Sequence, residues 1–194
     1  MKNLKMLGLL AVAAASLMAF AGSASATNVF TSPAGTHFTG TIHASLESGT
    51  TAVVKAGIED TCAEATIHGT ITVNNTTHAE GALTGGTPPT GLTFGKCTAH
   101  TAVGFSGSLT INDKGEVFSR NSRVEVYVTG IARCYYGAEV GSVKIGTLTG
   151  GTPATLDVNT TSLQKETGSD FLCASNGTWT GSYVVTSPSS LFIT

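Results

Sequence analysis

The chain has 194 residues, of which 11% are charged, and its formal net charge at pH 7 is -2. This balance excludes the basic footprint of a nucleic-acid-binding protein, and a hydrophobic fraction of 41% argues against disorder. The 32 threonines favour strands, whereas helix surfaces usually carry Glu, Lys, Arg and Ala. The composition therefore predicts a neutral all-β protein.

Residues 1–26 are typical of a signal peptide. Two lysines precede an apolar run from Leu7 to Phe20, and Ala24-Ser25-Ala26 has the small-residue pattern of a cleavage site. A membrane anchor is the alternative, but the run is short for a spanning helix of about 20 residues. We therefore expect a secreted or cell-surface protein. Its single domain would cover residues 27–194, with no transmembrane segment after cleavage.

The four cysteines are expected to form two disulfides, because export places the chain in an oxidising compartment. The sequence has no C-x-x-C pair, so neither a zinc knuckle nor a thioredoxin-type redox site is supported. Spacing alone leaves three pairings open. The cysteines are Cys62, Cys97, Cys134 and Cys173.

An internal repeat favours one of these pairings. Residues 81–90 read GALTGGTPPT and residues 146–155 read GTLTGGTPAT, with identical residues at eight of ten positions. Each copy lies between two successive cysteines, which predicts two related halves closed by Cys62–Cys97 and Cys134–Cys173. A turn sequence that arose twice in a Thr- and Gly-rich chain is the alternative.

Short alternating segments follow one another along the mature chain, separated by Gly, Pro, Asn and Asp. Asn112 to Gly115 reads as a tight turn with Gly115 at a positive φ. We predict an antiparallel, Greek-key-like β-sandwich, with the single Trp179 as a core anchor. An outer-membrane barrel is the alternative, but it would need aromatic girdles and longer segments. The predicted strands cover residues 36–46, 65–73, 102–111, 123–131 and 179–186.

The search for chemistry assigns no catalytic, cofactor-binding or metal-binding residue. The nearest G-x-S-x-G pattern, residues 104–108, has Ser108 in place of its last glycine. The H-E-x-x-H pattern is absent, and the five histidines are expected to be scattered. The acids beside Cys62, including Asp60, are expected to be solvated turn residues. A secreted hydrolase or sugar-binding module is a weaker alternative function.

Both ends of the mature chain are apolar and β-prone. The chain has few charged residues that could prevent its sheet edges from pairing with other chains. The ends are expected to pack onto their own domain. The alternative is that one end pairs with a neighbouring subunit and builds a fibre. The residues of this candidate subunit contact are Val29, Phe30, Leu191, Phe192 and Ile193.

Three stretches carry a resemblance to a known family. Residues 131–140 read IARCYYGAEV, residues 171–194 read FLCASNGTWTGSYVVTSPSSLFIT, and the mature start reads TNVFTSPAGTHFTG. They resemble small bacterial secreted β proteins with four cysteines, of the activator of alkane oxidation (PraB) family, and the resemblance implies a bacterial source. The resemblance implies a secreted, non-enzymatic protein that supports alkane utilisation through emulsification or cell-surface adhesion.

The partner expected from this resemblance is a hydrophobic substrate or an oil–water interface, and no cofactor is expected. The alternative is self-association, as the structural subunit of an extracellular filament or biofilm matrix.

Overall fold

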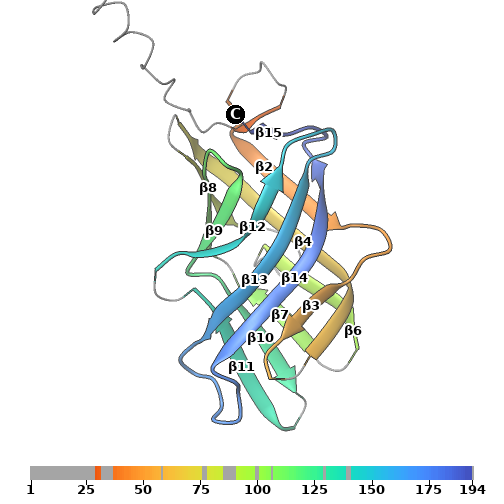
Figure 1. The fold of residues 1–194 in the computed structure, drawn as a ribbon, viewed down its shortest axis with the longest axis vertical. Coiled ribbons are helices and arrows are strands. Elements are labelled where there is room, and N and C mark those ends of the chain that lie inside the picture. The colour runs from red at the N-terminus through yellow and green to blue at the C-terminus, as the bar shows by residue number, and fades with distance from the viewer. Residues whose placement is uncertain are drawn as a thin grey trace, which may run out of the picture.

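The computed structural model describes residues 29–31, 37–57, 59–75, 78–84, 91–98, 101–105, 107–128, 130–138 and 141–193. The predicted signal peptide, residues 1–26, lies outside them. The described elements are all strands (Figure 1). Their bounds are β1 Val29–Phe30, β2 Gly40–Leu46, β3 Ala52–Lys55, β4 Glu59–Asn74, β5 Ala79–Leu83, β6 Leu92–Cys97, β7 Thr101–Phe105, β8 Ser108–Ile111, β9 Glu116–Arg120, β10 Arg123–Val128, β11 Ala132–Gly137, β12 Val143–Thr149, β13 Thr155–Lys165, β14 Asn176–Ser187 and β15 Phe192–Ile193.

The strands close into two barrels that share three long strands. One ring runs through β4, β5, β8, β9, β12, β13, β14 and β2 and returns to β4; we call it the upper barrel. The other, the lower barrel, runs through β4, β6, β7, β10, β11, β13, β14 and β3. Figure 1 shows β4, β13 and β14 running through both.

The predicted all-β, antiparallel class is confirmed, but the strands close on themselves instead of forming two facing sheets. The reason is the length of the shared strands. β4 has 16 residues and pairs with β3 and β6 in its first half and with β2 and β5 in its second half. One strand therefore supplies the closing edge of both barrels.

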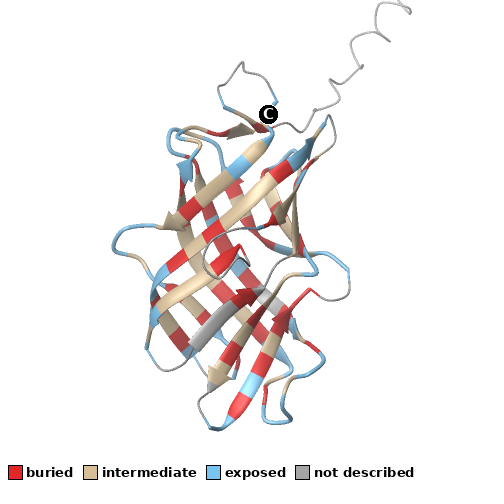
Figure 2. Cartoon of the chain, turned by 180° about the vertical axis from the view of Figure 1, so that it is seen from behind, coloured by how far each residue is buried: buried red, intermediate tan, exposed pale blue. Residues whose placement is uncertain are grey.

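Alternation of buried and exposed residues along the strands makes the core, as Figure 2 shows. In β4, Ile67 and Ile71 point inward. Unbroken alternation would place Val73 on the same face, but Val73 is 40% exposed. The register of β4 against β5 shifts between Ile71 and Val73, and a one-residue bulge turns the following side chain to the other face.

The lower barrel has an aromatic core in which Trp179 is buried, at 6% exposure. Its indole Nε1 donates to the hydroxyl of Tyr183 at 3.2 Å, and its ring meets Phe94 edge-on with centroids 5.8 Å apart. Tyr183 is fully buried, and burial raises the pKa of its phenol. The hydroxyl therefore stays protonated. Its oxygen gives the buried indole N–H of Trp179 a hydrogen-bond acceptor inside the core.

The turn predicted after the third segment is confirmed. Asn112 Oδ1 accepts hydrogen bonds from the backbone N–H of Lys114 at 3.0 Å and of Glu116 at 2.9 Å. Gly115 has a φ of 73°, which a residue without Cβ adopts freely. The segment predicted as one strand over residues 102–111 is divided into β7, in the lower barrel, and β8, in the upper barrel.

Both predicted disulfides are confirmed, Cys62–Cys97 and Cys134–Cys173. They are consistent with an oxidising compartment. The first joins directly paired residues of β4 and β6, and the second joins β11 to the loop between β13 and β14. The two copies of the repeat begin in strands of the upper barrel, with Gly81 in β5 and Gly146 in β12. Residues 85–90 of the first copy lie outside the described residues.

The two ends of the described chain pair with each other. Val29 is opposite Ile193 and Phe30 is opposite Phe192 in a two-stranded antiparallel sheet. Val29 and Leu191 are fully buried. The candidate subunit-contact residues are thus engaged within their own chain, which is the arrangement expected for ends that pack onto their own domain.

Within the described part of the chain, no helix has the length and apolar character needed to cross a membrane.

Candidate functional site

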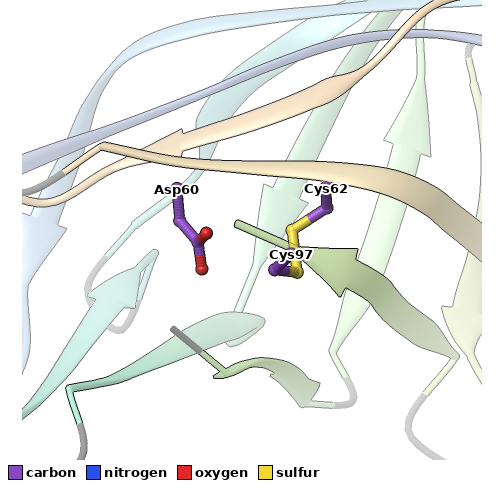
Figure 3. A group of neighbouring side chains, drawn as sticks. All are labelled: Asp60, Cys62 and Cys97. Atoms are coloured by element: carbon purple, nitrogen blue, oxygen red, sulfur yellow. A yellow bond between two sulfur atoms is a disulfide. The ribbon is translucent and has the colours of Figure 1, made fainter. Parts of the chain in front are cut away.

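Three potential metal-ligating side chains gather in the lower barrel: Asp60, Cys62 and Cys97 (Figure 3). Both sulfur atoms are joined in a disulfide, so neither is available as a thiolate ligand. Asp60 is fully buried instead of forming a solvated turn, and its Oδ1 accepts a hydrogen bond from Thr98 Oγ1 at 3.2 Å. The cluster therefore does not fit a metal ion and is a structural part of the core.

Two of the five histidines meet in the upper barrel wall, on β2 and β4. His43 is directly opposite His68, and the two rings pack edge-on with centroids 4.3 Å apart. Among the described residues, the Asp60 cluster is the only group of three potential ligands within reach of one ion. In the described part of the chain, no third ligand lies within reach of the histidine pair. His100 lies outside the described residues.

The histidine pair is expected to make the free energy of unfolding depend on pH. Burial and the neighbouring His43 lower the pKa of His68 below its usual 6.5, so the unfolded chain binds this proton more readily than the folded chain. We expect this contribution to the free energy of unfolding to be complete above pH 6.5. It should be lost as the pH falls through the lowered pKa.

Urea unfolding at several pH values between about 7.5 and about 5, a range that brackets the usual pKa of histidine, measures how the free energy of unfolding changes with pH. His68→Gln should flatten this dependence, whereas His78→Gln, which changes a histidine outside the pair, should leave it in place. Equal slopes in the wild type and in His68→Gln would contradict the role of the pair.

The most distinctive surface feature is a group of exposed apolar side chains at the end of the lower barrel. Phe171 is 89% exposed, Ile131 65% and Leu172 59%. Ile131 lies in the turn between β10 and β11, and the other two lie in the loop between β13 and β14. Figure 1 shows both connections at the end of the molecule opposite the C-terminus. We call these three residues the apolar pole.

The loop that carries the pole is fixed to the neighbouring hairpin. The backbone N–H of Arg133 donates to Asp170 Oδ2 at 2.7 Å, and the N–H of Asp170 donates to the Arg133 carbonyl at 3.0 Å. Lys165 Nζ donates to the carbonyls of Asp170 at 2.9 Å and Cys173 at 3.3 Å. The Cys134–Cys173 disulfide closes the other end of the loop. Phe171 and Leu172 are therefore held in solvent by bonds on both sides.

A hollow of about 180 Å³ opens beside the pole. Tyr136 supports its floor, since its hydroxyl donates to the carbonyls of Ala174 at 2.9 Å and Ala56 at 3.3 Å. The hollow and the pole together offer a nonpolar surface on a firm base, which can adsorb a nonpolar phase. The hollow is lined by Ala56, Gly57, Val126, Ile131, Ala132, Cys134, Leu172 and Ala174.

The residues of the pole lie in two of the stretches that carry the family resemblance, and no sequence motif assigns them a role. The available signal was a Phe-Leu pair between Asp170 and Cys173, in a segment without alternation. In a loop, such a pair is either covered or exposed, and the sequence does not say which. The pairing of the hairpin with this loop determines the exposure.

Comparison with known proteins finds no matching family model, no matching curated protein and no matching solved structure. The resemblance to the alkane-oxidation activators therefore stays a prediction from the sequence.

Proposed function

We propose that this chain is a secreted, non-enzymatic protein that adsorbs to hydrophobic surfaces through its apolar pole. In the context suggested by the family resemblance, the surface is an oil–water interface or a cell in contact with alkane. The observation that carries the proposal is the exposure of Phe171 and Leu172 on a loop closed by a disulfide, together with the exposure of Ile131 in the β10–β11 turn.

The energetics favour adsorption at this end of the molecule. Burying a side chain such as Phe or Leu contributes about 1.5–3 kcal/mol, and the loop is already ordered, so adsorption orders few further groups. Lys165 and Asp170 beside the pole already form hydrogen bonds within the protein, which limits the hydration that they lose when this surface approaches oil. A surface-active role needs no substrate pocket or reacting group.

Replacing Phe171 and Leu172 together by serine tests the proposal. We expect the double variant to need at least tenfold more protein than the wild type for equal coverage of hexadecane droplets, since about 1.4 kcal/mol corresponds to a factor of ten. The measurements are droplet binding and the rate at which the hexadecane–water tension falls at low protein concentration.

Val73→Ser is the matched control, because it removes another exposed apolar side chain on the wall of the upper barrel. It should adsorb like the wild type. Equal adsorption by the wild type and the pole variant would overturn the proposal.

The biological side of the proposal is tested in a deletion strain. We expect slower growth on alkane but not on a soluble carbon source, with complementation by the wild-type gene and not by the pole variant. Equal growth of the deletion strain on both carbon sources would remove the link to alkane.

A further inference from the structure

A partly open nonpolar cavity lies in the upper barrel, far from the pole. Its volume is about 70 Å³, several times the roughly 10–15 Å³ of free space that a cavity needs to hold one water. Aliphatic side chains, including Ile71, Leu109 and Leu148, form most of its wall, and small residues such as Ala44 and Ala79 leave the space open. Protein interiors are close-packed and contain few voids larger than a water molecule, so this space is unusual.

In the lower barrel, which is built partly from the same strands, side chains fill the interior around Trp179. This barrel has the same number of strands and shares three of them. Apart from the hollow at its end, beside the pole, the space beside Trp179 and Tyr136 has a volume of only about 20 Å³. Large aromatic rings occupy that interior. The free space in the upper barrel therefore comes from its side chains and not from the closure of the sheet.

The cavity offers little to a water molecule. Thr70 has the one hydroxyl among the side chains that line it, and this hydroxyl lies 3.4 Å from Thr84 Oγ1 at an exposed position. A buried water needs two to four polar partners, and cavities with nonpolar walls stay dry and accept nonpolar guests such as benzene or xenon.

One end of the cavity is closed by Leu191, which is fully buried and contributes to its wall. Its backbone is held by two hydrogen bonds with Gly151, at 2.7 and 3.1 Å. The strand that follows, β15, pairs only with β1 among the described residues. The closing segment is thus attached by few bonds compared with the barrel walls.

We propose that the upper barrel binds one small nonpolar molecule, of the class of the short alkanes, and that Leu191 is the side chain that moves to admit it. The proposal goes beyond adsorption at the apolar pole, because it concerns a separate site in the other barrel. A small closed barrel of this strand number has an interior that is either filled by side chains or able to hold one small ligand.

Methyl NMR of the full mature chain, with xenon and n-butane as probes, tests this site. We expect saturable shifts of the Ile71, Leu109 and Leu148 methyl resonances in the wild type. Ala44→Leu should fill the cavity and weaken the response at least tenfold, while the exposed Ala63→Leu should respond like the wild type. Leu191→Ala should retain binding and exchange the guest faster, because the mouth is wider.

Two results would overturn the proposal: no methyl shifts in either the wild type or Leu191→Ala, or equal shifts in the wild type and a folded Ala44→Leu. If Ala44→Leu does not fold, Ala79→Val provides the second filling variant under the same criterion. The Phe171→Ser/Leu172→Ser variant should bind xenon normally, so failure at the pole and failure of the cavity are distinguishable.

Discussion

Replacing Cys134 and Cys173 together by alanine is expected to lower the free energy of unfolding by about 4 kcal/mol. The two cysteines are 39 residues apart, and closing a loop of this length removes much of the entropy of the unfolded chain. The same bond fixes the loop of the apolar pole. We therefore expect weaker adsorption to hexadecane as well, because Phe171 and Leu172 would have to be ordered at the surface.

The matched control is the double replacement of Cys62 and Cys97, which are 35 residues apart. Its loss of stability should be about the same, on the order of 4 kcal/mol in the chain-entropy relation, but the pole loop keeps its own disulfide. Urea unfolding and droplet binding, measured on both variants under conditions where each is folded, separate the two effects. Equal adsorption by the two variants would contradict a role of the Cys134–Cys173 bond in presenting the pole.

The fold class, several strands and the disulfide pairing could be predicted because each rests on a local signal. Alternation in segments such as residues 65–73 and 123–131 reflects the two faces of a strand, and the Asn112 turn depends on contacts within five residues. The position of each repeat copy between two successive cysteines predicted the correct disulfide pairing.

Closure of the barrels could not be predicted in the same way. It depends on which edges of β4, β13 and β14 meet which partners, such as β4 with β6 and β13 with β11. Some of the closing pairs are far apart in the sequence, such as Tyr183 of β14 opposite Leu46 of β2. Alternation carries no information on such pairings. The bulge that exposes Val73 is likewise a property of the pairing with β5.

The candidate site was harder to predict than the fold. Phe171 and Leu172 have the composition of a core segment, and only the path of the β13–β14 loop places them in solvent. Asp60 shows the opposite case, since a carboxylate expected in a solvated turn is fully buried. In both cases the environment comes from neighbours distant in sequence, which a single sequence does not specify.

The first glycine of each copy of the repeat is required by the close approach of neighbouring strands. A Cβ on Gly146 would lie 2.2 Å from the carbonyl oxygen of Asp157, and a Cβ on Gly81 would lie 2.4 Å from that of Thr70. Both obstacles are backbone atoms of a strand paired on its other side as well. The repeated glycine thus marks equivalent contacts on two sides of the upper barrel.

Gly146→Ala is therefore expected to lower the free energy of unfolding by about 3 kcal/mol, the upper part of the range for overpacked cores. Gly95→Ala is the matched control, because it makes the same change within a strand where a Cβ would meet only the flexible side chain of Glu64, at 3.2 Å. Its effect should stay within about 0.5 kcal/mol. Urea unfolding of the two variants measures the difference. Equal stabilities would contradict the argument, because they would mean that β12 and β13 can move apart easily within the closed barrel.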